Sequence, residues 1–464
     1  MDKRGPALEG CAMNTAPAPA ATNTRKRIWG WWAFDWASQP YNTLLLTFIF
    51  GPYVNELLGD GTQAQTAWGY GVGAAGFLIA ISAPFLGAMA DLSGRRMPFI
   101  YLFSAMYVVG AYGLWWAAPG DFNLLLTLIL FAIGLIGMEF ATIFTNAMLP
   151  TLGNREEIGR ISGSGFAWGY VGGLVALVLM LFFFAENAET GKTLLGMDPI
   201  LGLDAATREG TRAVGPLTAI WFAIGMIPFF LWVRDTPQPG AVPMGRALRG
   251  ALPALIKTLR RLPSEKPLLA YLASSMFYRD ALNGMYVFGG IYASGVLGWS
   301  VVDVGIFGIL AILTGAFFSW LGGRADGRFG PKPVIVVNVL LLSFVALAVV
   351  FVSRDSVLGV PVAPDSSAPD IAFYILGAFI GACGGALQSS SRTMLVRQAY
   401  PDRMTEAFGL YALAGKATSF IAPLSIGLVT QLSGSQQVGV LPLVVLFAIG
   451  LVLLIWVAPE GRNE

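Results

Sequence analysis

Histidine is absent from the 464-residue sequence, and cysteine occurs only twice. Without histidine the chain has no His-based metal site, proton relay or Ser-His-Asp triad. Cys11 lies near the N-terminus and Cys383 lies inside an apolar run, so no disulfide or redox role is indicated. Charged residues are also scarce, at 12% of the chain, compared with about 25% in a soluble domain. This deficit predicts an integral membrane protein.

A nucleotide-binding loop of the form GxxxxGK[ST] is missing as well, which argues against an ATP-driven pump. An intramembrane enzyme would need a nucleophile–base set or a metal cluster, and the sequence shows neither. The formal net charge of +2 is spread over many short loops and does not indicate nucleic-acid binding. We therefore predict no enzyme, no cofactor and no metal, with the lipid bilayer and a small molecule as partners.

Hydrophobic residues make up 55% of the chain, and the mean hydropathy is +0.66. A helix needs about 20 predominantly apolar residues to cross a bilayer. Such runs lie at residues 29–54, 66–90, 97–118, 122–149, 160–185, 215–234, 267–295, 301–323, 333–353, 371–396, 406–431 and 438–457. The sequence therefore predicts an all-α membrane protein with twelve transmembrane helices in two six-helix bundles.

Lysine and arginine predict how these helices are oriented. With the N-terminus in the cytoplasm, the inner segments hold 22 of the 29 Lys and Arg residues and the outer segments hold 4. Cytoplasmic loops are enriched in these residues, so we predict that both termini are cytoplasmic. The domains are then a disordered cytoplasmic tail (1–27), an N-terminal six-helix bundle (28–235), a cytoplasmic central loop (236–266) and a C-terminal six-helix bundle (267–458).

The central loop is basic as well as apolar. Its cations alternate with leucine and isoleucine, and they are Arg246, Arg249, Lys257, Arg260 and Arg261. This pattern is typical of an amphipathic segment on the anionic inner leaflet. As for its role, a plain tether between the two bundles is favoured, and a regulatory partner site is the alternative.

A short basic loop between apolar runs occurs once in each half, at residues 87–96 and 322–332. Each copy has small residues, an Asp, a turn-forming Gly and then cations, and the second copy has one extra residue before Gly330. This resembles the loop signature of the major facilitator superfamily, and two copies imply a duplicated bundle that moves solutes by rocking. The resemblance implies a gating role for Asp91, Arg95, Arg96, Asp326, Arg328 and Lys332. Ordinary cytoplasmic positive charge is the alternative.

The two halves also align with each other along the sequence. Asn146 and Arg392 precede the same Met-Leu pair at an offset of 246, and the same register relates Tyr170 to Lys416. The two halves therefore form pseudo-symmetric bundles, as the major facilitator fold implies.

A narrower resemblance rests on residues 32–41, on residues 146–150 followed by 159–163, and above all on residues 408–420. These segments are similar to the autophagy-related vacuolar effluxer-like branch of the superfamily. That branch implies twelve helices and export or exchange of small solutes, with amino acids the proposed cargo of its fungal members.

Ionisable residues inside the predicted spans are the candidate functional residues, because such groups face a cavity or a partner. We predict proton coupling by one of the three acids, which are Asp35, Glu139 and Asp280. Asp35 leads because it shares a polar patch with Gln39 and Asn42. The alternatives are a helix-start position for Asp35 and packing ion pairs for the whole set.

Substrate binding is predicted for Gln39, Asn42, Arg279, Gln388, Arg392 and Lys416. A cation such as Lys416 could neutralise a substrate carboxylate or phosphate, whereas Arg392 alternatively lies at the cytoplasmic mouth. Aromatic residues of the 267–295 run, Tyr278, Tyr286 and Tyr292 among them, would suit a planar cargo if they line the cavity.

The leading function is therefore secondary active transport of a small organic solute, coupled to a proton or ion gradient, with an amino-acid-like cargo. Uptake of a planar aromatic vitamin such as riboflavin is one alternative, and a transporter-like membrane receptor is another. We expect a monomer in the cytoplasmic (inner) membrane of a bacterium.

Overall fold

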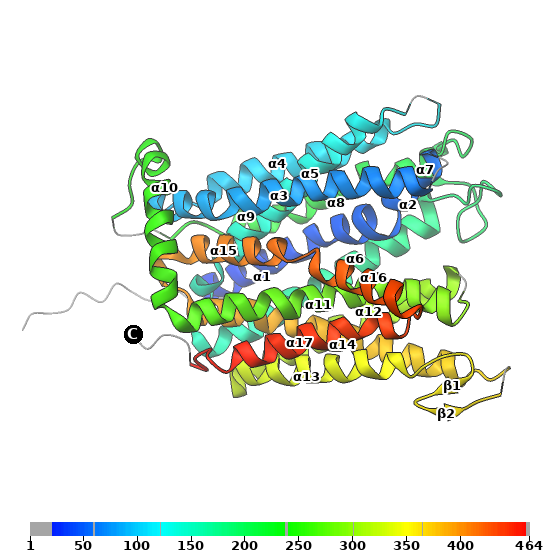
Figure 1. Cartoon of the computed structure of the whole chain (residues 1–464). Helices are drawn as coiled ribbons and strands as arrows, with labels where there is room; N and C mark the ends of the chain where they lie inside the picture. Colours follow the sequence, from blue (N-terminus) through cyan, green and yellow to red (C-terminus); the bar gives the residue numbers. More distant parts are fainter. Residues whose placement is uncertain are drawn as a thin grey trace, which may run out of the picture.

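The computed structural model describes residues 21–58, 61–120, 122–236, 240–299, 301–363 and 365–460. These residues form an elongated bundle of helices that run side by side (Figure 1). Most of the predicted tail, with Cys11, lies outside the described residues. Helix α1 begins at Ala21, whereas the tail was predicted to continue to residue 27.

The first half of the chain runs to the end of α9. Its elements are α1 (Ala21–Pro40), η1 (Tyr41–Phe48), α2 (Phe50–Leu58), α3 (Gly61–Ser93), α4 (Met97–Gly113), η2 (Leu114–Trp116), α5 (Leu124–Asn146), η3 (Leu149–Thr151), α6 (Arg155–Leu179), η4 (Met180–Phe184), η5 (Ile200–Gly202), α7 (Glu209–Arg212), α8 (Val214–Gly225) and α9 (Ile227–Trp232). The connection to the second half contains α10 (Met244–Arg261) and η6 (Leu262–Ser264).

The second half begins with α11. Its elements are α11 (Lys266–Val296), α12 (Val301–Phe329), α13 (Pro331–Val350), β1 (Ser356–Val357), β2 (Val360–Pro361), α14 (Ala368–Gln398), η7 (Pro401–Arg403), α15 (Met404–Ala417), α16 (Ile421–Ser433), η8 (Val438–Val440) and α17 (Leu441–Leu454). Strands β1 and β2 form a small antiparallel hairpin in which Val357 pairs with Val360.

Helices occupy all twelve predicted spans. Among the described residues, nine helical segments are long and apolar enough to cross a membrane, and the apolar helix Val438–Leu454 is shorter. The predicted runs 29–54 and 267–295 are not among the nine, because they carry polar and charged residues. The first is also divided into α1, the π-helix η1 and α2.

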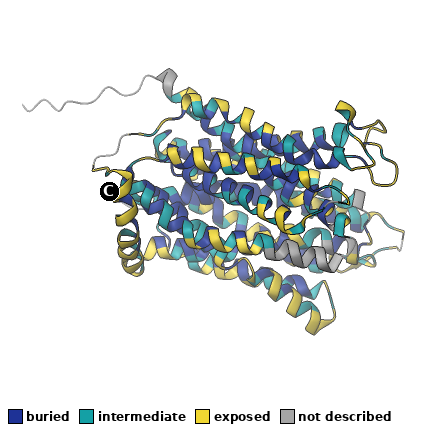
Figure 2. Ribbon diagram, turned by 90° about the horizontal axis from the view of Figure 1, so that it is seen from above, coloured by how far each residue is buried: buried dark blue, intermediate teal, exposed yellow. Residues whose placement is uncertain are grey.

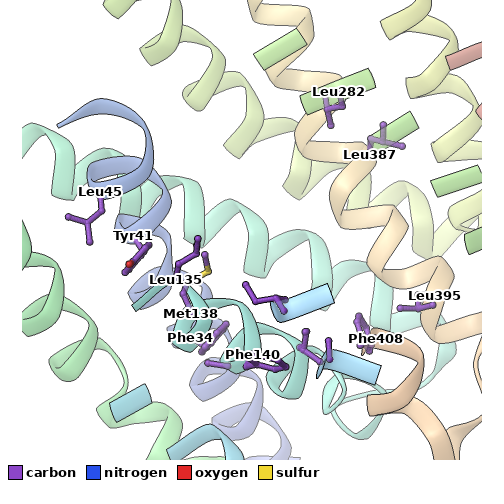
Figure 3. Close-up of a cluster of buried hydrophobic side chains, with 14 of the residues drawn as sticks. Phe34, Tyr41, Leu45, Leu135, Met138, Phe140, Leu282, Leu387, Leu395 and Phe408 are labelled. Atoms are coloured by element: carbon purple, nitrogen blue, oxygen red, sulfur yellow. The ribbon is translucent and has the colours of Figure 1, made fainter. Parts of the chain in front are cut away.

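The outside of the bundle is apolar, as a lipid-facing surface must be. Large apolar side chains are exposed around it, including Phe77, Leu125, Phe344 and Leu424. Buried residues line the interior (Figure 2). The buried side chains labelled in Figure 3 come from α1, η1 and α5 of the first half and from α11, α14 and α15 of the second, and they belong to one continuous cluster.

Two pairs of helices make the most extensive contacts between the halves: α6 packs on α12, and α3 packs on α15. Glycines permit both contacts, because small residues let helix backbones approach closely. A Cβ atom on Gly87 would lie 2.6 Å from the carbonyl oxygen of Thr405, and one on Gly409 would lie 2.6 Å from that of Ala83. In the other pair, Gly163 lies against the carbonyl of Ser319.

Helix α10 stands across the ends of the other helices, at the end of the bundle where the C-terminus also lies (Figure 1). We call this the α10 end. One side of α10 is buried against α3, where Ala251 and Leu255 form a small apolar cluster with Ala88. Part of the central loop is therefore packed against the first half.

Candidate functional site

Arg392 of α14 is the centre of the polar contacts between the two halves. Its side chain is only 4% exposed. Its Nε donates to Ser162 Oγ at 2.9 Å, and its Nη2 donates to the Ser162 carbonyl at 2.7 Å. Its Nη1 donates to Asn146 Oδ1 at 2.9 Å. Both guanidinium nitrogens Nη1 and Nη2 also reach Asp35 Oδ2, at 3.2 and 3.3 Å.

All these partners belong to the first half, whereas Arg392 belongs to the second. Two aromatic rings of the first half complete the surroundings, because the guanidinium lies 4.5 Å from the centre of Trp31 and 4.3 Å from that of Phe166. Arg392 and Asn146, which the internal repeat relates, are thus in direct contact. The guanidinium joins the two halves, as a buried charge with every donor satisfied can do.

A second ion pair also crosses between the halves. Lys416 Nζ of α15 lies 2.9 Å from Glu139 Oε1 of α5. The two side chains are 33% and 25% exposed, so this pair is less enclosed than the pair of Asp35 and Arg392. Four of the six predicted ionisable residues therefore form two ion pairs between the halves.

Gln388 forms a neutral bridge. Its Nε2 donates to the Tyr170 hydroxyl of α6 at 3.3 Å and to the Tyr286 hydroxyl of α11 at 3.5 Å. The other predicted aromatic residues of α11 have packing roles. Tyr278 is buried and bonds to Ser391, and Tyr292 is buried and donates to backbone carbonyls next to α13. Tyr286 is the one of these three tyrosines that shares Gln388 with Tyr170 of the first half.

Asp280 has a different role from the other acids. The predicted span 406–431 is broken between α15 and α16, and Asp280 Oδ2 of α11 accepts a hydrogen bond from Ala422 N, in the first turn of α16, at 2.9 Å. Its other oxygen has no hydrogen-bond partner in the described part of the chain. Arg279 contacts Tyr411 of α15 instead. Its guanidinium lies 3.9 Å from the centre of the Tyr411 ring and donates to the Tyr411 carbonyl.

The two neutral candidates of the first span contact their own half. Gln39 lies beside Gly173 of α6, and Asn42 Nδ2 lies 4.0 Å from the sulfur of Met138 in α5. Asp35, Gln39 and Asn42 are close together in the sequence. The ion-pair partner of Asp35, however, is Arg392 of the second half.

The first basic loop makes a gate-like contact at the α10 end. Asp91 Oδ2 accepts from Glu406 N at 2.8 Å, and Oδ1 accepts from Thr405 N at 3.2 Å. A carboxylate at this position caps the first turn of α15, which has no side-chain cap of its own. Arg96 Nη2 pairs with Asp91 at 3.1 Å, and its Nε donates to Thr405 Oγ1 at 2.8 Å. Arg95 is exposed.

The second loop does not repeat this arrangement. Asp326 Oδ1 accepts from Ser390 of its own half at 2.7 Å, although its side chain also lies against Gly159 of α6. Lys332 Nζ donates to the Val457 carbonyl, and Arg328 lies near the Phe329 ring. Among the described residues, Arg328 and Lys332 therefore form no ion pair with Asp326, and the gating role of these three residues stays a prediction.

The sequences of the two loops also differ, because Asp91 lies three residues before Gly94, whereas Asp326 lies four before Gly330. The start of α6 also needs no cap from the other half. Asn154 and Glu157 form a capping box there, with Asn154 Oδ1 accepting from Glu157 N at 2.9 Å.

We expect Asp91→Asn to lower the free energy of unfolding by about 1–3 kcal/mol, because it removes the charged cap of α15 and the partner of Arg96. The matched change Asp326→Asn should have a smaller effect or none, since it neutralises a buried carboxylate that has no ion pair among the described residues. Thermal unfolding of both variants in detergent measures the difference. Equal losses would contradict the asymmetry of the two loops.

Sequence reasoning missed several residues of this site, namely Trp31, Ser162, Phe166 and Thr405. For Ser162 a signal was present, because it stands among the small residues of Gly159-Arg160-Ile161-Ser162-Gly163. Small residues mark close helix crossings. The two aromatic rings had no such signal, since apolar residues surround them in the sequence.

Comparisons with known proteins agree with this architecture. The family model described as "Vacuole effluxer Atg22 like" matches residues 56–464. The chain is 23% identical over 440 residues to the uncharacterized MFS-type transporter YxiO of Bacillus subtilis, over 94% of this chain and 95% of that protein. It is 27% identical over 315 residues to autophagy-related protein 22 of Cryptococcus neoformans, over 66% of this chain and 51% of that protein. The chain thus spans about half the length of that fungal relative.

Solved structures share the fold. The major facilitator superfamily transporter FucP in the outward conformation matches with a TM-score of 0.67 at 15% identity, over 96% of this chain and 99% of that chain. The proton:xylose symporter XylE matches with a TM-score of 0.65 at 13% identity, over 94% of each chain. The predicted major facilitator fold and the narrower resemblance are therefore confirmed. The chain belongs to the Atg22-like vacuole effluxer family and is a multi-pass membrane transporter of the major facilitator superfamily.

Proposed function

We propose that the chain is a secondary active transporter that moves a small organic solute by alternating access, driven by a proton gradient. In this proposal the α10 end faces the cytoplasm of a bacterium, and the halves separate there during the cycle. The single observation that supports this most is Arg392, whose donors are all satisfied by the opposite half. A contact of this kind stabilises one conformation and must be broken to reach another.

Asp35 suits the role of the coupling group in this cycle. It supplies the negative charge that faces the guanidinium of Arg392 at 3.2 Å. A proton on Asp35 would remove that charge and weaken the contact between the halves. Proton binding and separation of the halves at the α10 end would then be linked.

Glu139 and Lys416 suit a zwitterionic cargo such as an amino acid. Both are partly exposed, and each pairs with the other across the halves. An amino acid carries an ammonium and a carboxylate, so it could replace the ion pair by binding Glu139 through one group and Lys416 through the other. The exchange would conserve charge pairing at each step.

A planar aromatic vitamin such as riboflavin is the second candidate cargo. Tyr170 and Tyr286 meet at Gln388, which would offer ring faces and hydrogen bonds to such a ligand. A transporter-like receptor would bind the same ligands without moving them.

The test of the function begins with a thermal-shift screen of the purified chain against the twenty common amino acids and riboflavin. A ligand that binds the folded state raises the melting temperature. Each ligand that does so is then offered, radiolabelled, to proteoliposomes with and without a pH gradient. Accumulation that depends on the gradient supports the proposal. Binding without uptake would favour a receptor. Uptake that does not depend on the pH gradient would contradict the proposed coupling to protons.

We expect Lys416→Ala to weaken the affinity for an amino acid by about 10–100-fold, because a charge-assisted hydrogen bond contributes about 1.5–3 kcal/mol. Lys416→Arg should retain most of the affinity. The measurement is the concentration dependence of the thermal shift for the amino acid with the largest effect. An unchanged affinity in Lys416→Ala would mean that the ion pair with Glu139 is purely structural.

A further inference from the structure

Helix α10 carries two apolar stripes, of which the packing uses one. Ala247, Ala251 and Leu255 are buried, and the last two contact Ala88 in α3. The second stripe is exposed and consists of Leu248, Leu252, Ile256 and Leu259, whose exposed fractions are 53%, 54%, 41% and 45%. Their spacing of four, four and three residues places them along one side of the helix.

The remaining side of α10 is strongly basic. Five cations and no acidic residue lie between Met244 and Arg261, namely Arg246, Arg249, Lys257, Arg260 and Arg261. An apolar stripe beside a cationic side is complementary to a membrane surface with anionic headgroups. It does not suit a solvated surface helix, which would be polar along its exposed side.

The position of α10 agrees with this partner. It lies across the ends of the membrane-spanning helices (Figure 1), so its axis runs along the plane of a membrane that those helices cross. A helix that lies across the ends of membrane-spanning helices lies near the headgroup level of one leaflet. The orientation proposed above makes this the inner leaflet, where anionic lipids attract basic segments.

α10 is also tied to both halves at the place where they meet. On one side it packs against α3, the helix that carries Asp91. On the other side, Arg403 Nη1 donates to Thr258 Oγ1 of α10 at 2.8 Å. Arg403 directly precedes α15, whose first turn Asp91 caps. Any force that holds α10 in place therefore acts on both sides of the contact between α3 and α15.

We propose that α10 is a binding surface for anionic phospholipids of the inner leaflet, and that lipid bound there stabilises the joined state of the α10 end. The proposal rests on the orientation in the proposed function. The exposed leucine stripe enters the headgroup boundary, and the cations bind the headgroup phosphates. Lipid composition would then regulate the transport cycle through the conformational equilibrium.

The test uses the full-length chain with Cys11 and Cys383 replaced by Ala and a single cysteine at Leu252, labelled with an environment-sensitive fluorophore. Dioctanoyl phosphatidylglycerol is titrated into the protein in detergent, and dioctanoyl phosphatidylcholine is the neutral comparison. We expect saturable binding of the anionic lipid alone. Replacing Arg246, Arg249 and Lys257 by Gln should weaken that binding on the order of a hundredfold.

The matched control removes three other cations at the same end. The variant with Arg155, Arg160 and Arg324 replaced by Gln has the same charge change away from α10, and its lipid affinity should match that of the parent. A spin-label pair at Glu156 and Asp402, one exposed residue from each half, reports the distance across the α10 end in nanodiscs. Adding phosphatidylglycerol should raise the share of the short distance, and the α10 variant should lose that response.

Equal affinity for the two lipids would overturn the proposal, and so would an equal loss of lipid affinity in both triple variants. A spin-label distance that does not change when phosphatidylglycerol is added would also overturn it. Binding of a cytosolic protein to α10 with no lipid response would assign the surface to a protein partner instead. None of these measurements uses transport. Lipid-dependent closure without gradient-driven uptake would therefore contradict the transport function alone, and uptake without a lipid response would contradict the role of α10 alone.

Discussion

Replacing Asp35 by Asn is expected to abolish gradient-driven accumulation of the cargo while leaving exchange across the membrane. Asn can still accept a hydrogen bond from Arg392, but it cannot take up and release a proton. The cycle would then carry cargo without being coupled to the pH gradient. The measurement compares net accumulation with counterflow in proteoliposomes, using the radiolabelled amino acid that gives the largest thermal shift.

The control for this experiment is Asp198→Asn, which neutralises an acid of the exposed pair with Lys192 in the connection between α6 and α8. An exposed pair contributes about 0–1 kcal/mol, so both activities should persist in the control. Unchanged accumulation in Asp35→Asn would remove Asp35 from the coupling role. Glu139 and Asp280 would then be the remaining candidates among the predicted acids.

Replacing Arg392 by Gln is expected to shift the equilibrium away from the joined state of the α10 end by about 10²–10⁴-fold. Removing one partner of a buried ion pair costs about 3–5 kcal/mol. Here the cost falls on one conformation, because the partners Asp35, Asn146 and Ser162 belong to the opposite half. Spin labels at Glu156 and Asp402 should report longer distances in the variant.

Two comparisons make this result specific. Lys192→Gln removes a cation from an exposed pair and should leave the distance unchanged. The conservative variant Arg392→Lys keeps the charge but loses the planar set of donors, so it should restore the short distance only in part. If Arg392→Gln retains the distance distribution of the parent, the guanidinium is not what holds the halves together.

The ionisable residues of the predicted spans show what the sequence can predict about the candidate site and what it cannot. Charge inside an apolar run is visible in the sequence, and its cost in a bilayer predicts that each such residue has a partner or a cavity. All six residues do have specific contacts in the structure. Their pairing was not predictable, because Asp35 and Arg392 are separated by 357 positions and Glu139 and Lys416 by 277.

The two basic loops illustrate the opposite case. Both copies carry an Asp followed by cations, and a gating role was predicted for both, although the second copy has one extra residue. In the structure Asp326 accepts a hydrogen bond from Ser390 of its own half, and the capping box of Asn154 already satisfies the start of α6. The internal repeat therefore predicts equivalent positions correctly while leaving the contacts at those positions undetermined.

The sequence by itself determined the membrane class, the helical spans, the duplication and the branch of the superfamily. These properties depend on composition, on the length of apolar runs and on local motifs, which are all properties of neighbouring residues. Only the tertiary structure decided which charges meet, which loop makes a lock and which stripe of α10 stays exposed. Those outcomes depend on the angles and spacings at which distant helices cross, and a rotation by one residue is enough to change them.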